Sequence, residues 1–89
     1  MVSDPNLILR EVVLNIQIIY CADWSYEKEA AGLAVNLLEY YKHDISMLQL
    51  VPADGGRFEV LVDGHLVFSK LDKDRFPEYK EIKDGIQLI

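Results

Sequence analysis

Hydrophobic residues alternate or recur along the chain in patterns that predict four strands and two helices. Residues 12–20 are dominated by branched apolar side chains, which is typical of a central strand covered on both faces. Residues 25–42 predict the clearest helix, because apolar residues recur there at spacings of three and four. Its apolar stripe consists of Tyr26, Ala30, Leu33, Ala34, Leu37, Leu38 and Tyr41.

The start of this helix carries two candidate N-cap residues, Asp23 and Ser25. Their side chains can accept hydrogen bonds from the free N–H groups of a first helical turn. Gly32 lies inside the helix, where glycine costs about 1 kcal/mol relative to alanine. Close packing against a neighbouring element is one explanation for this glycine.

Three further strands follow the helix. Residues 44–51 and 57–62 predict the second and third strands, joined by a loop over residues 52–56. Asp63-Gly64 is the strongest hairpin signal of the chain, since both positions of a type I′ turn need positive φ. Residues 65–70 are therefore expected to return as the fourth strand.

The chain closes with a polar connection over residues 72–75 and a second helix. Phe76-Pro77 marks the start of this helix, with proline at its first position. The apolar face of the helix consists of Tyr79, Ile82, Ile86 and Ile89. At the other end of the chain we expect residues 1–10 to fray, and the interrupted apolar run of residues 7–11 predicts no single state.

The order of elements is β-α-β-β-β-α, which predicts a two-layer α+β fold of the α/β type. A strand–helix–strand start implies a right-handed parallel crossover, and the hairpin adds an antiparallel pair. We expect one domain over residues 1–89, with a mixed four-stranded sheet in the order 2-1-3-4 and both helices packed against it. The loop over residues 52–56 must then cross strand 1; it spans up to about 17 Å against about 9.6 Å needed.

Composition narrows the function classes. Hydrophobic residues make up 51% of the chain, which is enough for a packed core, and 15 acidic against 9 basic side chains give a net charge of -6. This balance argues against nucleic-acid binding, which needs clustered Lys and Arg. The sequence shows no signal peptide and no apolar run long enough to span a membrane, so we expect no membrane association. A single free cysteine excludes an internal disulfide and suits the reducing cytoplasm.

Cys21 lies where the first strand gives way to the helix, and this position favours a reactive thiol. The thiolate is the nucleophile, and the N–H groups at a helix start favour negative charge. The helix contributes only about 0.3–1 kcal/mol, and Asp23 opposes it unless its side chain caps the helix. A small buried hydrophobe is the alternative interpretation of Cys21.

The predicted sheet order brings further candidates to the same end of strand 1. Gly55 and Gly56 would let the backbone approach the sulfur closely. Arg57 and Lys70 are the cations best placed to stabilise a thiolate. The interpretation of both as ordinary charges at a sheet edge is equally well supported by the sequence. His43 and His65 lie apart, with no ligand spacing, so we expect no metal site. The candidate substrate- or partner-binding residues are Trp24, Gly55, Gly56, Arg57, Ser69 and Lys70.

Several short motifs in this order resemble the selenoprotein W-like (Rdx) family. The matching pieces are Tyr20-Cys21, Gly55-Gly56-Arg57-Phe58-Glu59-Val60, Asp63-Gly64, Ser69-Lys70 and Phe76-Pro77. The resemblance implies a thioredoxin-like fold and a thiol oxidoreductase role in cell redox homeostasis, linked to glutathione and to protein partners.

The chain departs from the family pattern at one position. The family's Cys-x-x-Cys, or Cys-x-x-selenocysteine, reads here as Cys21-Ala22-Asp23-Trp24, so no second thiol can resolve a mixed disulfide. One-thiol chemistry remains: Cys21 as the catalytic residue would form a mixed disulfide with glutathione or a protein thiol, or a sulfenic acid. We expect no bound cofactor, with glutathione as a co-substrate.

A non-enzymatic interaction module that keeps the fold and has lost redox turnover is the alternative. Trp24 is interpreted first as a packing or lid residue, and second as part of an exposed interaction patch. A homodimer is a further option, because strands 2 and 4 would be open sheet edges. The sequence leaves open whether the protein is an enzyme.

Overall fold

The computed structural model describes residues 13–89, so the expectations for residues 1–10 and 7–11 lie outside the described residues. The elements are β1 (Leu14–Cys21), α2 (Glu27–Tyr41), the 3-10 turn η1 (Lys42–Asp44), β2 (Ile45–Ala53), β3 (Phe58–Val62), β4 (His65–Ser69), α3 (Lys70–Lys73) and α4 (Tyr79–Gln87). All four predicted strands and both long helices are present.

The four strands form one mixed sheet in the order β2-β1-β3-β4, as predicted. β1 is parallel to β2 and antiparallel to β3, and β3 and β4 form the antiparallel hairpin. At its turn Asp63 and Gly64 have φ of 51° and 82°, the two positive values that a type I′ turn requires. The predicted fold class is therefore confirmed.

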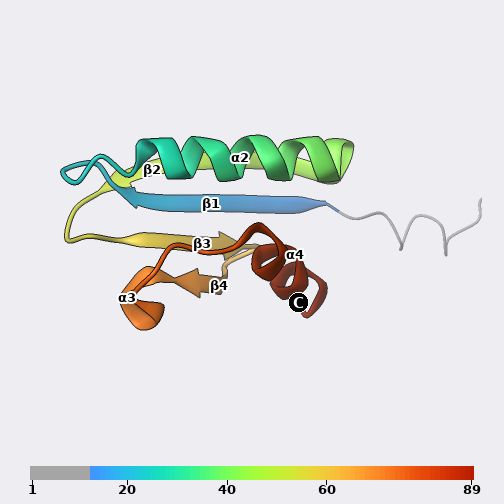
Figure 1. The fold of residues 1–89 in the computed structure, drawn as a ribbon. Helices are drawn as coiled ribbons and strands as arrows, with labels where there is room; N and C mark the ends of the chain where they lie inside the picture. Colours follow the sequence, from blue (N-terminus) through green and yellow to red (C-terminus); the bar gives the residue numbers. More distant parts are fainter. Residues whose placement is uncertain (1–12) are drawn as a thin grey trace, which may run out of the picture.

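Both long helices cover the same face of the sheet (Figure 1). The core between the layers takes every second residue of β1 and β3, because side chains alternate across a strand. The core residues of these strands are Leu14, Ile16, Ile18, Phe58, Val60 and Val62, and the helices add Ala30, Leu33, Ala34, Leu37, Ile82 and Ile86. The prediction that β1 is covered on both faces is wrong, since Asn15 and Gln17 are exposed on the other face.

The ends of the helices differ from the predictions. The polar connection predicted over residues 72–75 overlaps a short third helix, α3. α4 begins at Tyr79, not at Pro77, because Glu78 is its N-cap and forms a reciprocal capping box with Glu81. Pro77 lies one residue before the cap.

The start and the middle of α2 also differ. Its N-cap is Tyr26, without a side-chain hydrogen bond, so the assignment of Asp23 or Ser25 as the cap is wrong. Ser25 has a φ of 62°, which places it in a turn rather than at a helix start. A Cβ at Gly32 would have no atom within 4 Å, so close packing does not explain this glycine.

Candidate functional site

Cys21 is the last residue of β1, and its backbone is paired on both sides. Its N–H donates to the carbonyl oxygen of Arg57 at 2.8 Å, and its own carbonyl accepts from the N–H of Tyr26 at 3.1 Å. The next residue, Ala22, donates to the carbonyl of Ala53 at 2.9 Å. The end of β1 is therefore held between the segment that follows β2 and the turn that leads into α2.

The side chain of Cys21 has a solvent exposure of 0%. This burial agrees with the alternative interpretation of Cys21 as a small buried residue, and in this conformation no external disulfide can reach the sulfur. Backbone hydrogen bonds join Cys21 to the segment before β3 and to the turn into α2, and movement of these segments is what would have to uncover the sulfur. The catalytic role of Cys21 stays a prediction that requires this cover to open.

The turn over residues 22–26 forms one side of the site. Ser25 donates its N–H to the carbonyl of Ala22 at 3.1 Å, which closes the turn. The φ of 62° at Ser25 is a left-handed conformation that costs roughly 1–2 kcal/mol for a non-glycine residue. A turn that carries this strain opens more readily than an unstrained one.

Trp24 stands at the tip of this turn and is 61% exposed. One face of its indole lies on the backbone of Gly56: a Cβ at Gly56 would be 2.5 Å from Cζ3 of the ring. The edge of the ring meets Tyr26 at 6.1 Å between centroids and 85° between planes. Trp24 therefore fastens the turn onto the segment before β3 while most of its surface faces solvent.

Gly55 and Gly56 have φ of 72° and 74°, so the segment before β3 turns in a conformation that favours glycine. We predicted that these glycines bring the backbone close to the sulfur. What the structure shows for Gly56 is a close approach to the ring of Trp24, for which the absence of a side chain leaves room. The glycine pair in the sequence indicates a close approach at this point, but it does not indicate that the approaching group is the ring of Trp24.

The two predicted cations lie in different surroundings. Arg57 joins the site through its backbone carbonyl, and its side chain is exposed. The ammonium of Lys70 lies 5.5 Å from the ring centre of Tyr26 and 5.3 Å from that of Phe76, a cation–π arrangement. The neighbouring Ser69 is buried and its hydroxyl donates to Glu59 at 3.4 Å.

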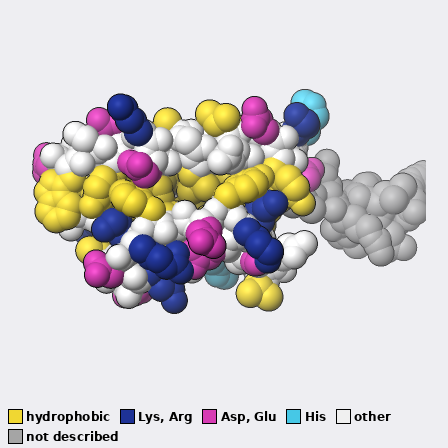
Figure 2. All heavy atoms as spheres, in the orientation of Figure 1, with side chains coloured by type: hydrophobic (Ala, Val, Ile, Leu, Met, Phe, Trp, Pro, Cys, Tyr) yellow, Lys and Arg dark blue, Asp and Glu magenta, His cyan; other side chains and the backbone are white. Residues whose placement is uncertain are grey.

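Sequence reasoning missed an aromatic cluster beside the turn. Phe76 packs edge-on against Tyr26 at 4.7 Å and against Phe58 at 5.2 Å. The sequence pattern interprets Phe76-Pro77 only as a helix start, whereas in the structure the ring of Phe76 completes this cluster. Figure 2 shows a band of hydrophobic side chains on the helix-covered face of the molecule. The band runs between α2 and the segment that contains α3 and α4.

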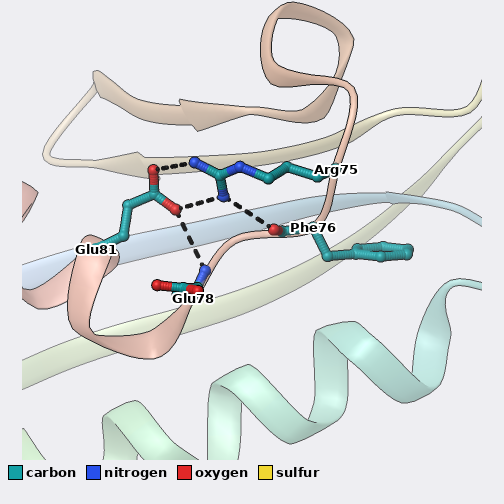
Figure 3. A network of polar contacts seen from close by, with 4 residues as sticks. All are labelled: Arg75, Phe76, Glu78 and Glu81. Atoms are coloured by element: carbon teal, nitrogen blue, oxygen red, sulfur yellow. Dashed lines mark hydrogen bonds and ion pairs between the residues drawn. The ribbon is translucent and has the colours of Figure 1, made fainter.

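A polar network fixes the chain on either side of Phe76 (Figure 3). Arg75 binds Glu81 with two hydrogen bonds of 2.9 Å each and also donates to the carbonyl of Phe76 at 3.2 Å. Glu81 accepts from the N–H of Glu78 at 3.2 Å. The hydrogen bonds from Arg75 lower the pKa of Glu81 from 4.5 to about 2.

A separate hollow lies at the other end of the molecule. It has a volume of about 550 Å³ and is lined by residues of α2 and α4, among them Tyr40, Tyr41 and Lys83. Leu14, at the start of β1, also lines it, whereas Cys21 ends that strand. This hollow is therefore too distant to serve as a substrate pocket for the thiol.

Within residues 13–89 no three His, Cys, Asp or Glu side chains come together as a metal-binding group. No helix among the described residues has the length and apolar character needed to cross a membrane.

Comparisons with known proteins agree with the fold. The model of the Rdx family matches residues 15–88. A crystal structure from Bordetella parapertussis is similar with 30% identity and a TM-score of 0.79, over 83% of this chain and 94% of that one. The crystal structure of a selenoprotein W-related protein from Vibrio cholerae is similar with the same identity and TM-score, over 83% and 92%. No curated protein matches the chain.

Proposed function

The chain belongs to the Rdx family, and on this premise we propose that it acts in thiol redox chemistry through Cys21 alone. The observation that carries the proposal is the position of Cys21 at the junction of β1 and the turn into α2, the turn that Trp24 fastens onto Gly56. The chain has no other cysteine, so the second thiol of each cycle must come from outside. Glutathione or a protein thiol supplies it.

The reaction is a thiol–disulfide exchange in two steps. The Cys21 thiol loses its proton to solvent, and the thiolate attacks the glutathione sulfur of a protein–glutathione disulfide. A Cys21–glutathione disulfide forms, and the protein thiolate leaves. A second glutathione thiolate then attacks the glutathione sulfur of this adduct, which forms oxidised glutathione and returns Cys21 as a thiolate.

The buried sulfur makes this a gated reaction. Exchange needs Sγ of Cys21, the glutathione sulfur and the leaving sulfur nearly in line, and Sγ is inaccessible while Cys21 is 0% exposed. The turn has two weak points, the left-handed Ser25 and the single face of Trp24 that lies on Gly56. We propose that the turn over residues 22–26 opens to admit the disulfide and closes again after release.

One observation favours a second candidate function. Trp24 occupies the family's second redox position, is 61% exposed, and lies beside the cluster of Tyr26 and Phe76 with the Lys70 ammonium. An exposed aromatic group next to a cation is typical of a protein-binding surface. In this alternative the chain binds a partner through Trp24, and Cys21 is a core residue.

Intact-mass spectrometry after incubation with oxidised glutathione separates the two functions. The redox proposal expects one glutathione adduct on the folded chain and its release by reduced glutathione. A folded chain that forms no adduct, while the unfolded chain is modified readily, overturns it. For the alternative, Trp24→Ala weakens partner capture and Cys21→Ala leaves it unchanged; the reverse pattern contradicts it.

A further inference from the structure

The strand β2 forms one edge of the sheet and has an unusual sequence for an edge. It is nine residues long, Ile45–Ala53, and contains no charged side chain. An edge strand presents unpaired N–H and C=O groups, and proteins usually block such edges with lysine or other charges, or keep the strand short. The opposite edge, β4, is five residues long. β2 has one blocking residue, Pro52, close to its end.

Apolar side chains continue this edge onto the helix layer. Leu50 pairs with the core residue Ile18, so it points toward the helix-covered face, yet it is 42% exposed. On α2, Val35 and Leu38 are 52% and 45% exposed. Large exposed apolar residues on two adjacent layers are costly unless another surface covers them.

The two α2 residues lie on the side of the helix that faces away from α4. Leu33, Asn36 and Tyr40 line the hollows shared with α4 and the segment before it. At about 100° per residue, Val35 and Leu38 fall on the opposite side of the helix. Figure 1 shows α2 in front of β2, so the helix and the strand lie along the same edge of the molecule. We call β2 with Val35 and Leu38 the β2-edge surface.

We propose that the β2-edge surface binds a second copy of this chain, with the two β2 strands paired antiparallel about a two-fold axis. Such an interface is isologous, so in the paired strands each uncharged β2 residue meets an uncharged β2 residue of the partner. The net charge of -6 opposes association through charged surfaces, whereas the two β2 strands meet without like-charge contacts. The pairing satisfies the open backbone groups and covers Leu38 and Leu50.

The dimensions suit a weak dimer. Nine strand residues extend over about 30 Å, and a sheet with a helix layer is about 20 Å thick, which gives roughly 600 Å² per copy. Two copies then bury about 1,200 Å², the lower end of the range for specific interfaces. We therefore expect a dissociation constant in the micromolar range. The proposal is independent of Cys21 and of the proposed redox function.

Analytical ultracentrifugation of the full chain tests the proposal, with a reductant present so that no disulfide contributes. The sedimentation coefficient is expected to rise from the monomer to the dimer value between about 1 µM and 500 µM. Leu38→Lys, at an exposed helix position, is expected to weaken association at least tenfold. Leu66→Lys, at a 55% exposed position on β4, is the matched control and should leave it unchanged.

Hydrogen exchange locates the interface. At high concentration the amides of β2 should gain protection, and those of β4 should not. A chain that stays monomeric to about 500 µM overturns the proposal. Dimerisation that survives Leu38→Lys, or that protects β4 instead, overturns it as well and points to a different surface of this chain.

Discussion

The indole ring of Trp24 lies on the backbone of Gly56 so closely that a Cβ there would be 2.5 Å from ring atom Cζ3. This contact joins the turn after β1 to the segment before β3, the two segments that enclose the end of β1 at Cys21. Gly55, one residue earlier, has nearly the same φ, but a Cβ there would meet nothing within 4 Å. The pair of glycines therefore offers a matched test of the contact.

Gly56→Ala is expected to destabilise the protein more than Gly55→Ala. Both variants force alanine into a left-handed conformation, which costs about 1–2 kcal/mol, but only Gly56→Ala also displaces the ring of Trp24. We expect the excess loss to be about 1 kcal/mol, measured as the difference in unfolding free energy from urea titrations. In a Trp24→Ala background the two variants should lose equal amounts, and an excess that persists there would show that Trp24 is not its cause.

Trp24→Ala is expected to speed the modification of Cys21 by a small alkylating reagent about tenfold. The removal of the ring deletes the contact that fastens the turn, and tenfold corresponds to about 1.4 kcal/mol of easier opening. Leu66→Ala is the control, because it removes an apolar side chain of similar exposure, 55% against 61%, from β4 near the hairpin turn. Equal rates in all three proteins, under native conditions, would mean that the turn over residues 22–26 does not gate the sulfur.

Glu81 is expected to make the protein acid-sensitive. Its pKa is lowered to about 2 by Arg75, so its stabilising contribution is fully present above about pH 4.5 and is lost as the pH falls toward 2. Because both side chains are partly exposed, we expect Glu81→Gln to cost only about 1 kcal/mol at pH 7. The variant should also show a flatter loss of stability between about pH 5 and pH 2, measured by urea titration at each pH.

Asp84→Asn is the control for Glu81→Gln. It breaks the ion pair with Lys80, which joins two exposed side chains one helical turn apart and contributes little because solvent screens it. If both variants lose the same small amount, the paired hydrogen bonds of Arg75 and Glu81 do not hold the segment before α4.

The sequence was sufficient for the sheet order and for the hairpin, because both depend on local signals. Asp63-Gly64 specifies its turn by φ preference, and the apolar periodicity of α2 identifies the helix that connects two parallel strands. The contact of Trp24 with Gly56 was not predictable in the same way, because it joins residues 32 positions apart and depends on the exact path of two turns.

The burial of Cys21 and the role of Phe76 were hidden for the same reason. A cysteine at the end of a strand is covered or exposed according to how the next turn folds back, and Ser25 takes an unusual conformation there. The ring of Phe76 comes from the other end of the chain to pack on Tyr26 and Phe58. Local sequence patterns therefore predict where the site lies, but they do not predict how deeply the side chain of Cys21 is buried in it.

The final prediction concerns substitutions of Cys21 itself. Since its side chain is fully buried, a serine hydroxyl at this position must find a hydrogen-bond partner or remain unsatisfied at a cost of about 1–3 kcal/mol. Alanine leaves only a small void, with an expected cost of about 1 kcal/mol. We therefore expect Cys21→Ser to be less stable than Cys21→Ala by about 1 kcal/mol, measured by urea titration of both variants.

The comparison of these two variants also tests the gate. If the turn over residues 22–26 stays closed for nearly all of the time, serine is penalised as a buried hydroxyl and the ranking holds. If the two variants are equally stable, the serine hydroxyl has a hydrogen-bond partner in the folded state, either water or a protein group. An alkylation rate of Cys21 that stays the same in the Trp24→Ala variant then identifies the partner as water, which contradicts the gated form of the proposed reaction. A stability difference together with faster alkylation in that variant supports a thiol that reacts only after the Trp24 contact breaks.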